Sequence, residues 1–207
     1  MGLTTEQLTE AMDALAAREP AFAVALERVG YPPPRISERG FGTLLRTIIG
    51  QQVSVTSAQS TWNRLEGIVG DLTDPQNIIA ATDEQLRAAG LSRQKASYAR
   101  SLSALVASGE LDLANLPEDD EEAIAKLVAV KGIGRWSAEI YLLFAEGRTD
   151  IWPAGDLAVQ IEIGRLLGHE ARPSEKLVRE LAEAWRPHRG AAAIFAWYHY
   201  QSDMKVI

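Results

Sequence analysis

Two features near the middle of the sequence have residue types that can do chemistry together: a glycine turn and a single aspartate. In the segment KGIGRWSAEIY, Gly132 and Gly134 bracket a turn that opens a helix. The N-terminus of a helix presents backbone N–H groups without intrahelical partners, and these groups attract phosphate. Lys131 and Arg135 flank the turn, and Asp156 follows in the segment WPAGDLAVQ. A phosphate-binding turn followed by one carboxylate indicates an enzyme that acts on nucleic acid.

The composition excludes several other classes of protein. The 207 residues are 46% hydrophobic and 24% charged, as in an ordinary globular protein. The absence of cysteine excludes disulfides, thiolate zinc sites and iron–sulfur clusters. The histidines His169, His188 and His199 form no metal motif. No apolar stretch reaches the ~20 residues of a membrane span, and the acidic N-terminus does not resemble a signal peptide. We therefore expect a cytoplasmic protein without a transition metal or a membrane partner.

The net charge of −7 argues mildly against a nucleic-acid partner, because cationic side chains supply most non-specific affinity for phosphate. The local distribution of charge matters more than the sum. Basic residues recur at Arg93, Lys95, Arg100, Lys131 and Arg135. One reading is a basic surface on one side of the molecule, and the other is a set of scattered, solvated charges.

Apolar residues recur at helical spacing through almost the whole chain, and no segment shows the alternation of a strand. Capping signals support this pattern, such as the capping box of Thr82 and Gln85 and the aspartate before LAVQIEIG. The predicted helices are 3–18, 41–50, 54–69, 82–90, 94–108, 121–128, 135–145, 157–167, 175–185 and 191–200. The sequence therefore predicts an all-α fold of about ten helices, with a break at the YPPP run.

Five segments in order resemble the helix-hairpin-helix (HhH-GPD) DNA glycosylase superfamily, and more narrowly its 3-methyladenine DNA glycosylase II group. They are IIGQQVSV, GLSRQKASYA, KGIGRWSAEIY, PAGDLAV and AWYHY. The resemblance implies a monomer of two helical subdomains with the active-site cleft between them. Residues 1–39 with 149–207 would form the subdomain that carries Asp156, and residues 40–148 the one that carries the hairpin. Larger relatives have an N-terminal β domain, which we expect this chain to lack.

The resemblance also implies how DNA is held. Such enzymes flip the damaged nucleotide out of the duplex, and a wedge fills the gap. The loop GQQVS matches the wedge, so that Gln51 and Gln52 are candidates and Gln52 is preferred; ordinary helix-terminal glutamines are the alternative. The residues expected to contact the DNA backbone are Lys131, Gly132, Ile133, Gly134 and Arg135, with Arg93 and Lys95 as further candidates.

Asp156 is the expected catalytic residue. Cleavage of an N-glycosidic bond builds positive charge on the sugar, which a nearby carboxylate stabilises. The same carboxylate can orient or deprotonate the attacking water. An aspartate at this place is also a good helix N-cap, and the two roles are compatible because the cap fixes the carboxylate's direction.

Trp136 stands where bifunctional relatives carry the lysine that forms a Schiff base, so we expect no lyase activity. Trp136, Trp197 and Tyr198 match aromatic pocket positions, where rings can favour a cationic base. Core packing is the alternative for the apolar run AIFAWYHY. Ile140 occupies a pocket position where better-known members have a tyrosine, which implies an altered pocket.

The resemblance also implies a sodium or potassium ion at the hairpin, held by the backbone carbonyls of Val128, Val130 and Ile133, and no other cofactor. The predicted function is monofunctional excision of alkylated purines, such as 3-methyladenine or 7-methylguanine, from double-stranded DNA in base excision repair. Three alternatives stay open: a related glycosylase for deaminated or mismatched bases, a non-catalytic DNA-binding hairpin module, and a helical protein–protein adaptor.

Overall fold

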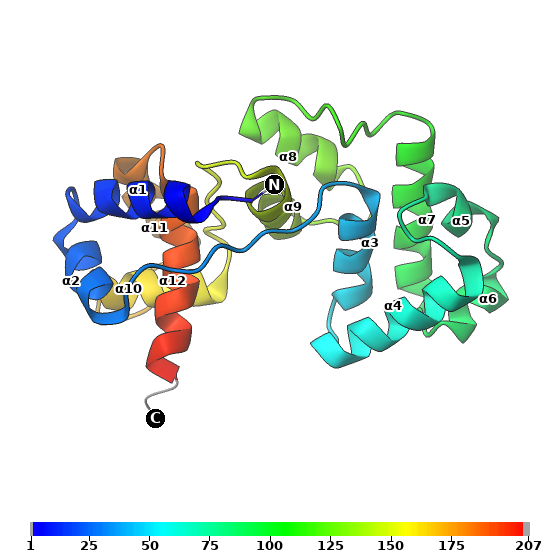
Figure 1. The fold of residues 1–207 in the computed structure, drawn as a ribbon, viewed down its shortest axis with the longest axis horizontal. Coiled ribbons are helices and arrows are strands. Elements are labelled where there is room, and N and C mark those ends of the chain that lie inside the picture. Colours follow the sequence, from blue (N-terminus) through cyan, green and yellow to red (C-terminus); the bar gives the residue numbers. More distant parts are fainter. Residues whose placement is uncertain (1, 205–207) are drawn as a thin grey trace. The chain divides into compact units, whose positions relative to one another are not determined.

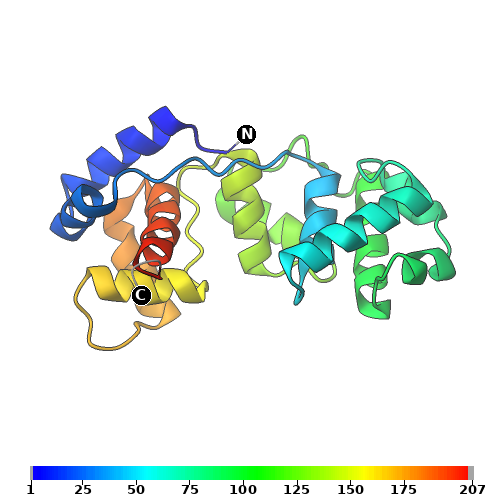
Figure 2. The ribbon, with the colours of Figure 1, turned by 60° about the horizontal axis from the view of Figure 1, so that its bottom comes forward.

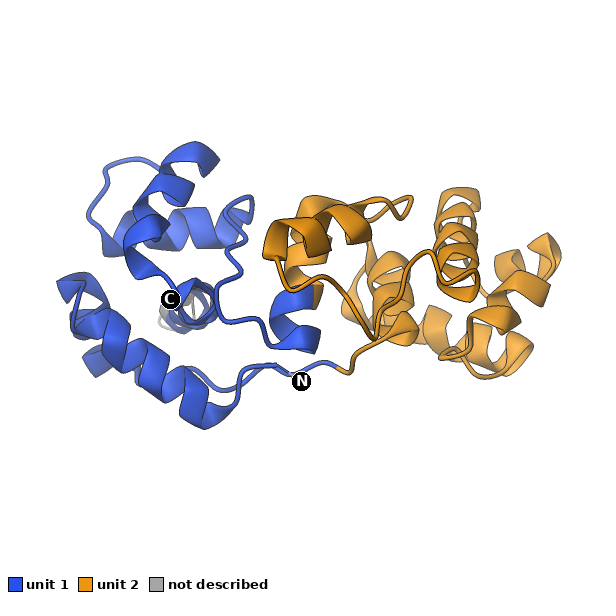
Figure 3. Cartoon of the chain, turned by 90° about the horizontal axis from the view of Figure 1, so that it is seen from above, with its two compact units in different colours: residues 1–37, 142–207 blue, residues 38–141 orange. Residues whose placement is uncertain are grey.

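The computed structural model describes residues 2–204, and every regular element within them is helical. This confirms the all-α prediction. The chain forms two compact units, one of residues 1–37 and 142–207 and the other of residues 38–141 (Figure 3). The division expected from the sequence has its boundaries after residues 39 and 148. None of the helices in the described part of the chain combines the length and the apolar character that a membrane span requires.

The first unit is arranged around its last helix (Figure 1, Figure 2). This helix, α12, contacts α1, α2 and α10, and its buried alanines let these neighbours approach closely. The elements of the unit are α1 (Thr5–Ala16), α2 (Pro20–Val29), a π-helical turn η1 (Leu142–Glu146), α10 (Leu157–Leu166), α11 (Glu175–Ala182), a 3₁₀ turn η2 (Glu183–Trp185) and α12 (Arg189–Met204).

An aromatic cluster and a buried ionic group hold the first unit together. Phe22 of α2 packs edge-on against Trp185 and Phe195, with ring centroids 5.1 and 5.9 Å apart. One turn further along α12, the ring of His199 packs against that of Phe195, and His199 and Glu162 are both buried, with 2.5 Å between Nδ1 and Oε1. Arg28 donates to Nε2 of this histidine, so the ring proton lies on Nδ1 and points to the carboxylate. The group thereby connects α2, α10 and α12.

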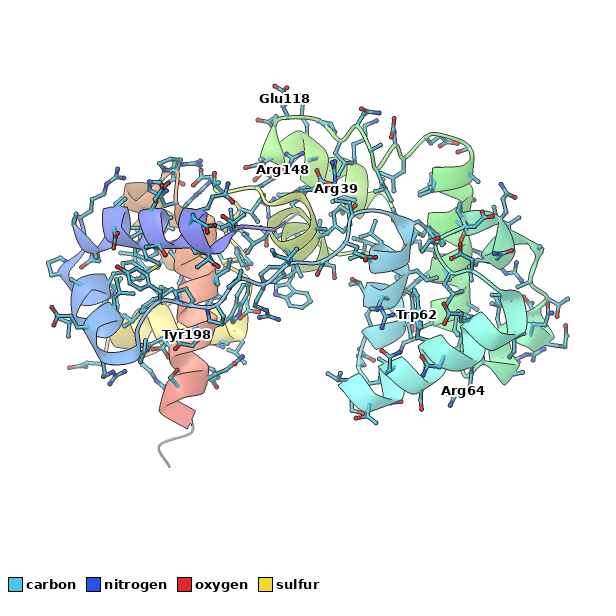
Figure 4. The ribbon with its side chains drawn as sticks, in the orientation of Figure 1. Arg39, Trp62, Arg64, Glu118, Arg148 and Tyr198 are labelled. Carbon is cyan, nitrogen blue, oxygen red and sulfur yellow. The ribbon has the colours of Figure 1, made fainter. Side chains whose placement is uncertain are left out.

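The second unit contains the hairpin. Its helices are α3 (Phe41–Gly50), α4 (Val55–Val69), α5 (Pro75–Ala80), α6 (Asp83–Ala88), α7 (Arg93–Ala107), α8 (Asp120–Val128) and α9 (Arg135–Tyr141). Helix α7 packs against α3 and α5, and α8 packs against α9. Trp62 of α4 is buried, and the guanidinium of Arg46 lies 4.0 Å from its ring centroid (Figure 4). Helix α7 therefore supports α3 and α5, while α8 and α9 form the two helices of the hairpin.

Most helix starts follow the capping signals of the sequence. Thr82 and Gln85 form the predicted capping box, and Asp156 caps α10. Two helices have no counterpart among the predicted ones, namely α2 and α5. Helix α2 has ten residues and α5 has six, and both begin with proline at the first helical position, where the missing N–H costs nothing. The described residues therefore hold twelve α-helices rather than about ten.

Candidate functional site

The hairpin turn between α8 and α9 depends on Gly132. Its φ of +88° lies in the left-handed region that side chains disfavour. A Cβ atom at this position would lie 2.1 Å from Cδ2 of Tyr98, which projects from α7. The turn is closed by a hydrogen bond from the Ile133 N–H to the Val130 carbonyl, at 3.0 Å. Glycine is therefore required here by the backbone and by the ring of Tyr98 together.

Gly134 has a different role, at the start of α9. Its carbonyl accepts the N–H of Ala138 at 3.0 Å, which makes it the residue that precedes the helix. Glycine has no side chain with which to cap the first-turn N–H groups. A Cβ atom at Gly134 would meet nothing within 4 Å, and the residue is exposed. An anion can therefore approach the N-terminus of α9 at Gly134.

The structure gives the two cations of the hairpin different surroundings. Arg135 donates to both oxygens of Glu121 and to Oε1 of Glu139, the last at 2.9 Å. These carboxylates hold the pKa of the Arg135 guanidinium well above its usual value. The sequence predicts that Arg135 contacts phosphate. In the structure its guanidinium joins α8 to α9 through these two carboxylates. Lys131 is exposed, and its backbone N–H donates to the hydroxyl of Ser101.

The loop after α3 is tied to the hairpin and to α7. Nε2 of Gln51 donates to the Gly132 carbonyl at 2.7 Å. Nζ of Lys95 donates to the Ile49 carbonyl at 2.7 Å, and burial lowers the pKa of this lysine. Among residues 2–204, Gln52 is the one non-glycine residue with positive φ, at 55°, and it is exposed. Gln51 and Lys95 thus position the loop, and Gln52 stands at its exposed tip.

The remaining candidates of the second unit lie at its surface. Trp136 is 47% exposed in the first turn of α9, and Ile140 follows one turn later, partly buried. Tyr141 is buried, and its hydroxyl accepts the N–H of Gly40 at the start of α3. It therefore supports α3. Arg93 is exposed at the start of α7, beside a surface pocket that Arg87 also lines.

In the first unit, Asp156 is held in one orientation. Its Oδ1 accepts the backbone N–H of Val159 at 3.0 Å and the indole Nε1–H of Trp197 at 3.1 Å. The first bond is that of an N-cap, and the second comes from α12, far along the chain. Asp156 is partly buried. Two donors on one oxygen fix the plane of the carboxylate, which is the preorganisation that a catalytic anion needs.

Trp197 also belongs to an aromatic group. Its ring centroid lies 5.7 Å from that of Phe144, on η1, and both rings are buried. The guanidinium of Arg35 lies 4.7 Å from the Phe144 ring and 5.8 Å from the Trp197 ring. Neither Arg35 nor Phe144 could be identified from the sequence, since neither belongs to a motif and the contacts join distant segments. Tyr198 is not in this group: its hydroxyl donates to the Val29 carbonyl at the end of α2 (Figure 4).

The structure thus collects the predicted site residues into two sets. Gln51, the hairpin and Lys95 are in contact within the second unit. Asp156 and Trp197 are in contact within the first unit. The carbonyls named for a monovalent cation lie at the end of α8 and in the turn, and that of Val130 already accepts one hydrogen bond. A carbonyl oxygen has a second lone pair, so the turn is compatible with such an ion.

Comparison with known proteins places the chain in a family. A model described as "HhH-GPD superfamily base excision DNA repair protein" matches residues 45–187. A putative DNA-3-methyladenine glycosylase of Bacillus subtilis is 27% identical over 165 residues, which are 76% of this chain and 58% of that protein. The chain therefore spans little more than half the length of this relative.

Two solved structures agree with the family model. The DNA-3-methyladenine glycosidase of Bacillus halodurans superposes with a TM-score of 0.87 and 29% identity, over 96% of this chain and 91% of that one. The 3-methyladenine DNA glycosylase of Schizosaccharomyces pombe, solved in complex with abasic DNA, gives a TM-score of 0.77 and 27% identity, over 94% and 97%. The resemblance carried by the five sequence segments is confirmed, and the chain belongs to the HhH-GPD superfamily of base excision DNA repair proteins.

Proposed function

We propose that this protein is a DNA glycosylase that excises alkylated purines from double-stranded DNA and leaves an intact abasic site. The observation that carries the proposal is the Asp156 carboxylate, fixed by Val159 and Trp197 on one oxygen. The names of the relatives, as 3-methyladenine glycosylases, support the substrate class. The complex of the S. pombe relative with abasic DNA supports the DNA partner.

Asp156 acts on the sugar. When the bond between C1′ and the base nitrogen breaks, its electron pair goes to the base, and the sugar becomes positively charged. A fixed anion beside C1′ stabilises this charge without reorganisation. Water then adds to C1′ and loses a proton, which Asp156 or solvent accepts. Alkylation of a ring nitrogen makes the base a better leaving group, so that one oriented carboxylate suffices.

The second unit would supply the grip on DNA. The uncapped N-terminus of α9 behind Gly134 binds a backbone phosphate, with the exposed Lys131 beside it. The carbonyls of Val128, Val130 and Ile133 hold a sodium or potassium ion next to that phosphate. Gln52 enters the gap left by the flipped nucleotide, while Gln51 keeps its loop against the hairpin. We propose that the protein works as a monomer.

Base release from methylated DNA tests this function. We expect the protein to liberate methylated purines from N-methylated duplex DNA, well above spontaneous depurination of the same DNA, and to leave undamaged DNA intact. Chromatography of the released bases measures the reaction. Release from duplexes with deaminated or mismatched bases, but none from methylated DNA, would favour the related glycosylase. No release from any duplex, with binding to an abasic analogue retained, would favour the non-catalytic module.

Trp136 predicts that the reaction stops at the abasic site. Indole has no amine to form a Schiff base with the sugar. Borohydride added during turnover is therefore expected to trap no covalent protein–DNA adduct, and the product strand should break only after alkaline treatment. A trapped adduct on denaturing gels would contradict this. The Trp136→Lys variant introduces an amine at this position. Trapping of an adduct with this variant would show that the assay can detect a covalent protein–DNA adduct.

A further inference from the structure

Arg35 brings a permanent positive charge to the rings beside Asp156. Its guanidinium carbon lies 4.7 Å from the ring centroid of Phe144 and 5.8 Å from that of Trp197. The same indole donates its N–H to Asp156, at 3.1 Å. Arg35 is therefore separated by one side chain from the carboxylate that the proposed function makes catalytic.

The backbone around Arg35 is fixed along η1. The N–H of Ser37 donates to the Phe144 carbonyl at 2.8 Å. A Cβ atom on Gly2 would lie 2.6 Å from the carbonyl of Arg35 and 2.8 Å from that of Phe144, so the three main chains pack tightly. The residues before Arg35, 32–34, are prolines, which restrict the backbone further. The backbone at Arg35 is thus held beside that of Phe144.

Within residues 2–204, the Arg35 guanidinium forms no ion pair and no hydrogen bond; it interacts with the two rings, and the residue is exposed. Ring faces attract the cation but accept few of its five N–H donors. The donors form a planar fork that matches paired acceptor atoms. Purine edges present such acceptors on ring nitrogens and exocyclic oxygens.

We propose that Arg35 is a specificity-determining residue that lowers the release of cationic alkylated purines relative to that of neutral purine lesions. The proposal rests on the proposed function. A cationic base would meet a like charge on the ring faces that would otherwise attract it. A neutral base leaves with the electron pair of the C1′–N bond and so becomes an anion. The guanidinium stabilises this anion by donating N–H hydrogen bonds to it, without losing a proton. Solvent protonates the anion after release. A cationic base leaves neutral and gains nothing from this charge.

The test compares two lesions in otherwise identical duplexes, 7-methylguanine as the cationic base and hypoxanthine as the neutral one. In the Arg35→Met variant, which keeps the length of the side chain but has no charge or donor, we expect the ratio of cationic to neutral release to rise on the order of ten-fold, measured in single turnover. Arg172→Met, which removes an exposed charge from the same unit, is the control and should leave the ratio unchanged.

Melting curves check that the variants fold, and Arg35→Gln replaces Arg35→Met, with the same expected direction, if the methionine variant does not. A ratio that is unchanged or lower, or an unchanged release rate in Arg35→Met where the wild type releases only one of the two bases, overturns the role of Arg35 and leaves the proposed function standing. A wild type that releases neither base, nor any methylated purine, overturns the proposed function and this inference with it.

Discussion

Asp156→Asn is expected to lower the rate of base release by about three orders of magnitude while the protein stays folded and bound to DNA. The amide keeps an oxygen that can accept from Val159 and Trp197, so the local geometry is preserved. Asparagine is also a good N-cap, so α10 should lose little stability. What disappears is the negative charge that stabilises the sugar. Single-turnover release from methylated DNA measures the rate, and anisotropy with an abasic-analogue duplex measures binding.

A matched control is available at another helix start. Asp74 caps α5 through the Gln76 N–H, so Asp74→Asn makes the same chemical change at a cap in the other unit. This variant should release bases at the wild-type rate. Trp197→Phe keeps a ring but removes the second donor to Asp156, and a smaller loss, about ten-fold, is expected because one hydrogen bond to a charged group contributes roughly 1.5 kcal/mol. Near-normal excision by Asp156→Asn would remove this residue from the catalytic role.

The parts of the fold that could be predicted from the sequence are those determined by neighbouring residues. A capping box such as that of Thr82 and Gln85 involves two side chains three positions apart, and it forms as expected. The N-cap role of Asp156 is local in the same way. The helices α2 and α5 were not predicted, although each begins with an acidic N-cap residue followed by proline at the first helical position.

The partners of the charged side chains could not be predicted, because they come from distant segments. Arg135 reads as a phosphate ligand in its motif, but α8 brings Glu121 against it. From the sequence, Lys95 is likewise expected to be a surface cation. In the structure its ammonium donates a hydrogen bond to the Ile49 carbonyl near the end of α3. Arg35 belongs to no motif and reaches Trp197 only because the chain crosses η1. Each contact depends on how helices pack, which spacing along the chain does not encode.

Gly132 is determined both by its own backbone conformation and by the distant side chain of Tyr98, and its substitution has the largest expected effect on stability. Gly132→Ala should lower the free energy of unfolding of the second unit by about 3 kcal/mol. The positive φ contributes roughly 1–2 kcal/mol of this for a residue with a Cβ. The clash with Tyr98 contributes roughly another 1–3 kcal/mol, the usual cost of overpacking. Urea denaturation followed by circular dichroism measures the change.

Two further variants separate the causes. Gly134→Ala adds the same methyl group two residues away, where a Cβ meets nothing, so its stability should change by less than about 1 kcal/mol. In a double-mutant cycle, Tyr98→Ala removes the ring that Gly132→Ala would strike, and the second substitution should then cost only the backbone strain. Hydrogen exchange should place the loss in α7 and α9. Equal effects of the two glycine variants would mean that Tyr98 does not determine the residue at 132. If neither substitution lowered stability while both lowered DNA affinity, the two glycines would matter for phosphate binding alone.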